Sequence, residues 1–143
     1  MRWIMAFVLS TGAAFPAAAK IIVACPWVRA TLPHQDTAAA YMTLTSPAGD
    51  TLTGVDAQEA GMVMLHETRV VNGVEQMNDL EQLKLKPNMP LALEPGRIHL
   101  MLMDLKQPIV AGGTLHISLH FVKDGDVAVA APVLPANAPG RCQ

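Results

Sequence analysis

The sequence is poor in aromatic residues and in charge. Phe, Trp and Tyr make up 4% of its 143 residues, which leaves too few rings for the stacking platforms that bind single-stranded nucleic acids. Charged residues make up 15%, and the formal net charge is −2. Such a balance provides neither a basic face for nucleic acid nor a polybasic patch for a membrane surface. We therefore expect no nucleic-acid partner.

The sequence also lacks the residue sets of the common catalytic sites. It shows no Ser-His-Asp or Cys-His arrangement for nucleophilic catalysis and no glycine-rich loop that would cradle phosphate. Nothing in it supplies a general base beside a metal site. We therefore expect a protein that is not an enzyme and that takes no small-molecule substrate.

The N-terminus has the pattern of a secretory signal peptide. Arg2 provides a positive charge, an apolar run follows, and the run ends in three alanines at Ala19. This pattern predicts a signal peptide over residues 1–19, a domain over residues 20–134 and a flexible C-terminal tail over residues 135–143. A retained membrane helix is less favoured, because the apolar run is shorter than the roughly 20 residues of a span.

Cysteine is scarce, and its two occurrences are Cys25 and Cys142. An even number in an exported chain permits a disulfide. This bridge would close a loop of around 100 residues, worth up to about 4.7 kcal/mol in the chain-entropy model. Two free thiols are the alternative, and lipidation of Cys25 is a third, because the residues before it resemble a lipobox. Neither cysteine has a His or Met at ligand spacing.

Short segments in which apolar and polar residues alternate recur about every ten residues. In the segment 114–122 every second residue from Leu115 to Phe121 is apolar, which is the period of a half-buried strand. Turn residues separate these segments, and no segment shows a helix of convincing length. The pattern predicts an antiparallel β-sandwich or barrel.

One of these turns, Asn72-Gly73, is a strong hairpin signal, because both central positions of a type I′ turn require positive φ. Antiparallel pairing about this turn sets Thr68 opposite Met77. It leaves His66 just beyond that pair, so Met77 returns to the neighbourhood of His66.

Histidine and methionine gather between His66 and Met103. The segment 97–103 alternates, so that His99, Met101 and Met103 share one strand face and aliphatic residues take the other. Imidazole suits copper and zinc, whereas thioether sulfur is a soft ligand that selects Cu(I). Met103, and Met64 on the face of His66, either assist such a site or pack beside it.

The spacing of His66, Met77, His99 and Met101 resembles the His-x10-Met-x21-His-x-Met pattern of the periplasmic copper chaperone family PCu(A)C, and every interval matches. With five His and nine Met in the chain, this spacing arises by chance about once in a thousand cases. The resemblance runs over nearly the whole mature chain, from about residue 21 to Val133. It includes the segments Leu65-His66-Glu67, Asn72-Gly73-Val74, His99 to Pro108, Trp27 to Thr31 and Ala38 to Met42.

This resemblance implies an all-β, cupredoxin-like Greek-key antiparallel β-sandwich that is periplasmic and monomeric. It implies that His66, Met77, His99 and Met101 hold one Cu(I), with Cu(II) as a second oxidation state. The partner that it implies is cytochrome c oxidase subunit II, whose dinuclear copper centre would receive the metal. Some members of the family carry a methionine after the first histidine, where this sequence has Glu67.

Two other functions are open. In a structural or interaction β-sandwich of the cell envelope, the methionines would be core residues. A protein that sequesters Cu(II) or zinc would use His34, His116 and His120 instead. A blue-copper electron carrier is disfavoured, because its site needs a Cys thiolate and none lies near the candidate ligands.

Overall fold

The computed structural model describes residues 20–140 and 142, which form ten β-strands and, within this part of the chain, no helix. The predicted signal peptide over residues 1–19 lies outside the described residues. The described part of the chain accordingly holds no helix able to cross a membrane. The strands are β1 (Ile22–Arg29), β2 (Ala38–Thr45), β3 (Asp50–Ala57), β4 (Ala60–Val71), β5 (Val74–Leu80), β6 (Leu83–Leu85), β7 (Leu91–Leu93), β8 (Ile98–Leu105), β9 (Thr114–Phe121) and β10 (Gly125–Leu134).

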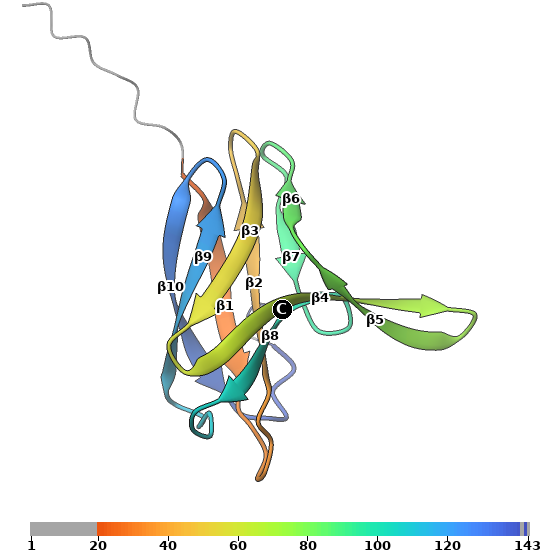
Figure 1. The fold of residues 1–143 in the computed structure, drawn as a ribbon, viewed down its shortest axis with the longest axis vertical. Coiled ribbons are helices and arrows are strands. Elements are labelled where there is room, and N and C mark those ends of the chain that lie inside the picture. Colours follow the sequence, from red (N-terminus) through yellow and green to blue (C-terminus); the bar gives the residue numbers. More distant parts are fainter. Residues whose placement is uncertain (1–19, 141, 143) are drawn as a thin grey trace, which may run out of the picture.

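The strands follow one hydrogen-bonded path in the order β5-β4-β8-β2-β1-β10-β9-β3-β6, with β7 paired to β2. This path turns over on itself, so that the strands form two layers (Figure 1). The predicted cupredoxin-like β-sandwich is confirmed. One pair departs from the antiparallel prediction, because β1 and β10 run parallel with Val28 opposite Val133. These are the first and last strands of the domain, so no short turn joins them and none dictates their relative direction.

The core lies between the two layers and consists of aliphatic side chains. Leu44, Leu100 and Leu102 come from one layer and Leu52 and Leu119 from the other, and all five are fully buried. Because side chains alternate along a strand, burying these residues turns their neighbours in sequence to the outer faces. The functional side chains described below lie on one such outer face.

A disulfide joins Cys25 on β1 to Cys142, with 6.1 Å between the Cα atoms. It uses the Cys25 sulfur, so the lipidation and free-thiol alternatives for this residue are both wrong. The Arg29 side chain also donates a hydrogen bond to the carbonyl of Ala138 (3.4 Å). The segment after Leu134, predicted as a flexible tail, is therefore tethered to β1 at two points.

The β4–β5 hairpin extends away from the rest of the molecule (Figure 1). Asn72 and Gly73 form its turn with φ values of 52° and 77°, as a type I′ turn requires. Thr68 lies opposite Met77, which confirms the predicted register. β5 ends the path of strands, and most of its side chains are exposed.

Candidate metal centre

Two neighbouring strands, β4 and β8, place the candidate histidines side by side. His66 lies directly opposite His99, and the adjacent pair Leu65–Leu100 points into the core. Residues that oppose one another share a sheet face, as do residues two apart on one strand. Met101 therefore lies on the same outer face as both histidines.

The rings of His66 and His99 lie edge to face, with centroids 5.7 Å apart and planes at 81°. His99 is only 5% exposed. Its Nδ1 is 3.2 Å from the Arg97 carbonyl oxygen, which accepts a hydrogen bond and so leaves Nε2 with the lone pair. Burial lowers the pKa of His99 below its ordinary value of 6.5, even though this hydrogen bond opposes the shift. The ring is thus neutral at neutral pH and able to bind a metal.

His66 is held by a carboxylate of the next strand. Its Nε2 is 2.9 Å from Oδ1 of Asp79, the residue opposite it on β5. Its Nδ1 is buried and has no hydrogen-bond partner among the described residues. A buried polar atom without a partner is costly, so this nitrogen is a candidate ligand atom.

The two methionines lie on either side of this histidine pair. Met101 is half-buried on β8, between Ala39 of β2 and Met64 of β4. Met77 lies on β5 opposite Thr68 and is 55% exposed. The structure therefore places all four predicted ligands on one face of three adjacent strands, with His66, His99 and Met101 at neighbouring positions and Met77 at the rim.

Comparison with known proteins identifies the family. The chain matches the family model described as "Putative lipoprotein LpqE-like" over residues 21–133. The chain belongs to the LpqE-like family. A relative named "Putative lipoprotein Lxx21020", from Leifsonia xyli subsp. xyli, is 32% identical over 108 residues, and the match covers 75% of this LpqE-like chain and 65% of that protein.

Solved structures connect this LpqE-like chain to PCuAC domains. The copper-bound PCuAC domain of PmoF2 superimposes with a TM-score of 0.69 at 26% identity, over 83% of this chain and 96% of that domain. The Cu(I) form of DR1885 from Deinococcus radiodurans gives a TM-score of 0.59 at 28% identity, over 90% of this chain and 85% of that one. The resemblance to the PCu(A)C family is therefore confirmed.

Two aromatic residues that the sequence analysis did not predict, Trp27 and Tyr41, form a row that ends at the buried His99 of this LpqE-like protein. The Tyr41 ring lies 6.4 Å from His99 and 4.5 Å from Trp27, and the Arg29 guanidinium lies over both aromatic rings. The row shields one side of His99 from water. Desolvation by burial raises the pKa of Tyr41, although the Arg29 charge opposes the shift.

The described part of the LpqE-like chain holds no group of three or more His, Cys, Asp or Glu side chains placed to bind a metal. A metal site on the histidine face would therefore depend on thioether ligands. Both cysteines are in the disulfide, so no thiolate is present for a blue-copper centre.

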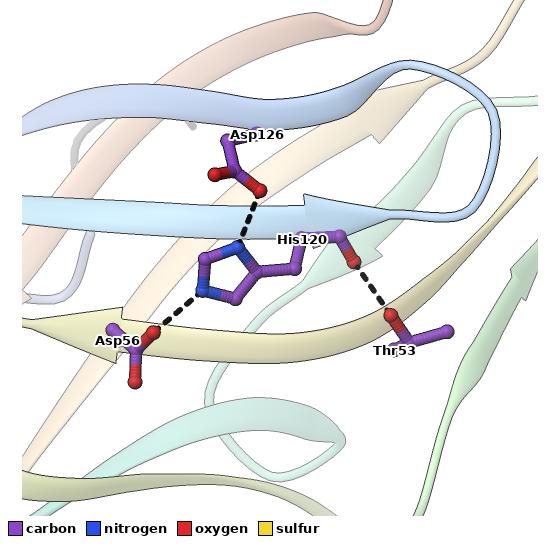
Figure 2. A network of polar contacts seen from close by, with 4 residues as sticks. All are labelled: Thr53, Asp56, His120 and Asp126. Carbon is purple, nitrogen blue, oxygen red and sulfur yellow. Dashed lines mark hydrogen bonds and ion pairs between the residues drawn. The ribbon is translucent and has the colours of Figure 1, made fainter.

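Two of the three remaining histidines, His116 and His120, pair with carboxylates. Figure 2 shows His120 between two carboxylates, with Nδ1 2.7 Å from Asp126 and Nε2 2.6 Å from Asp56. His116 instead pairs with Glu59 at 3.6 Å. Because each of these histidines has its own acidic partner, the structure gives no support to a sequestering site built from His34, His116 and His120.

Proposed function

We propose that this protein is an exported metallochaperone that holds one Cu(I) through His66, Met77, His99 and Met101. The observation that carries the proposal is the direct opposition of His66 and His99, with Met101 on the same face. The similarity to PCuAC domains named as copper-bound and as Cu(I) forms supports copper as the metal.

The distance between the two rings fits a shared ion. A metal held about 2 Å from one nitrogen of each imidazole sets the ring centroids about 5–6 Å apart, and the centroids of His66 and His99 are 5.7 Å apart. The approach of the rings needs no change in strand pairing, because the register of β4 and β8 already brings them together.

The chemistry of the proposed ligands favours Cu(I) over Cu(II) and zinc. Two thioethers are soft donors, and two neutral imidazoles complete a set without negative charge. The lowered pKa of His99 keeps that ring available at neutral pH. The Cu(I) ion would then carry the only charge in the site. Because no anionic ligand holds it, such a site suits an ion that must be released to a partner.

The graded exposure of the ligands suits transfer to a partner. His99 is 5% exposed, whereas Met77 is 55% exposed on the projecting hairpin. An incoming ligand of a partner protein would replace Met77 first, while the histidines retain the ion until the exchange is complete. We propose the dinuclear copper centre of cytochrome c oxidase subunit II as the acceptor, on the strength of the family resemblance. In this proposal the protein is a carrier and not an enzyme.

The proposed site of action is the periplasm. The leader pattern of residues 1–19 and the Cys25–Cys142 disulfide both support an oxidising compartment outside the cytosol. Relatives named as lipoproteins agree with export.

An anaerobic competition titration against a coloured Cu(I) chelator tests the proposal. The purified protein should withdraw one equivalent of Cu(I) from the chelator, and His99→Ala and Met101→Ala should abolish this competition. Circular dichroism of each variant controls for folding. The proposal would be wrong if the wild-type protein failed to compete with the chelator, or if both variants competed as well as the wild type. The structural or interaction β-sandwich of the cell envelope would then be the better interpretation.

A further inference from the structure

The contact between His66 and Asp79 assigns a role to each nitrogen of the His66 ring. A neutral imidazole has one nitrogen that donates and one that accepts. Oδ1 of the Asp79 carboxylate lies 2.9 Å from Nε2, and a carboxylate oxygen can only accept, so we assign the ring proton to Nε2. The lone pair is then on Nδ1, the buried atom without a partner among the described residues.

We propose that Asp79 is a positioning residue that fixes the His66 tautomer and ring orientation, so that His66 binds copper through Nδ1. The proposal rests on the proposed function and deepens it. A ligating histidine commonly donates its second N–H to a carboxylate, which orients the ring and makes the ligating nitrogen more basic. Asp79 is placed for this role by its register opposite His66.

The order of the strands agrees with this assignment. β5, which carries Asp79, and β8, which carries His99, flank β4 on opposite sides. The two nitrogens of an imidazole point away from one another across the ring. A ring whose Nε2 reaches β5 therefore directs Nδ1 away from β5, which is the side where His99 and Met101 lie.

The two histidines would consequently use different atoms. In His99 the Nδ1–H faces the Arg97 carbonyl and Nε2 is left to bind the metal. In His66 the Nε2–H faces Asp79 and Nδ1 is left to bind the metal. The His99 ring is thus oriented by the residue that precedes its own strand, and the His66 ring by the projecting hairpin. The hairpin would contribute Met77 to the ion directly and act on His66 through Asp79.

The test compares Asp79→Ala and Asp79→Asn with Glu75→Ala as the matched control. Glu75 is an exposed carboxylate on the same face of β5 and lies opposite Val70. We expect Asp79→Ala to weaken Cu(I) binding by about 10- to 100-fold. Asp79→Asn should retain more affinity, because an amide oxygen still accepts the Nε2 hydrogen bond. Glu75→Ala should bind as the wild type does.

Long-range ¹H–¹⁵N NMR of the copper-free protein supplies a readout that a purely structural role would not change. His66 should show a single Nε2–H tautomer in the wild type and a mixture in Asp79→Ala. Copper binding to the wild type should then shift the Nδ1 resonance of His66.

Two results would overturn the role of Asp79 while leaving the proposed function intact. In the first, the wild type binds Cu(I) and Asp79→Ala binds it equally well or more tightly. Asp79 would then have no effect on the site, or would oppose binding of the ion. The other is an Nδ1–H tautomer of His66 in the copper-free wild type. Absence of binding by the wild type itself would overturn the proposed function, and the role of Asp79 with it.

Discussion

Met64 on β4 lies directly opposite Met101 on β8, on the face that carries both histidines. Only Met101 belongs to the four proposed ligands, so Met→Leu substitutions separate the two residues by removing sulfur at nearly constant volume. Met101→Leu should weaken Cu(I) binding by at least about tenfold, or about 1.4 kcal/mol. Met64→Leu should leave it nearly unchanged in the same chelator titration. An equal loss in both variants would show that Met64 is also a ligand.

Met77 should matter for copper and not for folding. Its side chain is 55% exposed, so Met77→Leu should change the free energy of unfolding by less than about 0.5 kcal/mol. The same change should weaken Cu(I) binding and speed the loss of copper to the chelator in stopped-flow measurements. Met89 is similarly exposed, at 56%, and lies between β6 and β7. Met89→Leu is therefore the control, and a matching effect there would discount Met77 as a ligand.

Asp50 should make stability depend on acid pH. It is buried and accepts backbone hydrogen bonds from Thr51, Lys123 and Asp124. Burial by itself would raise the pKa of Asp50, but these donors and the Lys123 charge lower it below its ordinary value of 3.8. Its contribution is therefore fully present above that value and is lost as the pH falls through the lowered pKa.

Replacement of this carboxylate should be costly, because it leaves backbone donors without their acceptor. Asp50→Ala should lower the free energy of unfolding by at least about 2 kcal/mol at pH 7. The difference from the wild type should shrink as the pH falls towards 2. Urea denaturation at several pH values measures both effects, and a difference that is constant with pH would contradict the assignment.

His120 should contribute stability with the opposite pH dependence. Hydrogen bonds to Asp126 and Asp56 raise the pKa of His120 above its ordinary value of 6.5. A raised pKa stabilises the fold below about pH 6.5, and this contribution is lost as the pH rises through the folded-state value. The Asp126→Asn and Asp56→Asn variants should each lower the pKa measured by NMR. If neither variant changed the pKa of His120, the hydrogen bonds drawn in Figure 2 would not be the cause of its raised pKa.

Loss of the Cys25–Cys142 disulfide should destabilise the protein without removing its copper ligands. The cysteines are 117 residues apart in sequence. The double variant Cys25→Ser and Cys142→Ser should therefore lose about 2–5 kcal/mol of unfolding free energy. Treatment with a thiol reductant should lower the melting temperature of the wild type and leave that of the double variant unchanged. Cu(I) stoichiometry should remain one in both proteins.

Local patterns predicted the parts of the site that local chemistry determines. The Asn72-Gly73 turn fixes the pairing of Thr68 with Met77, and strand alternation places His99 and Met101 on one face. The same count from the turn pairs His66 with Asp79, so the position of this carboxylate was available from the sequence. Its close contact with Nε2 of His66 was not, because alternation gives the face of a side chain and not the direction of its atoms.

The features that the sequence left undecided are non-local. The choice between a disulfide and free thiols at Cys25 depends on where the tail ends in space. The parallel pairing of β1 with β10 and the row of Trp27, Tyr41 and His99 depend on the order of strands across the sheet. No periodicity within a segment encodes that order, and neighbours of this kind are defined only after the layers have assembled.

The place of β1 between β2 and β10 also has a consequence for how the chain matures. Ribosomes make β1 first among the ten strands and β10 last, so a nascent chain that stops before residue 125 leaves one side of β1 without its partner. Contacts of such long sequence separation form late and place folding on a timescale of milliseconds to seconds. The complete ten-strand sheet can therefore close only after β10 has been made.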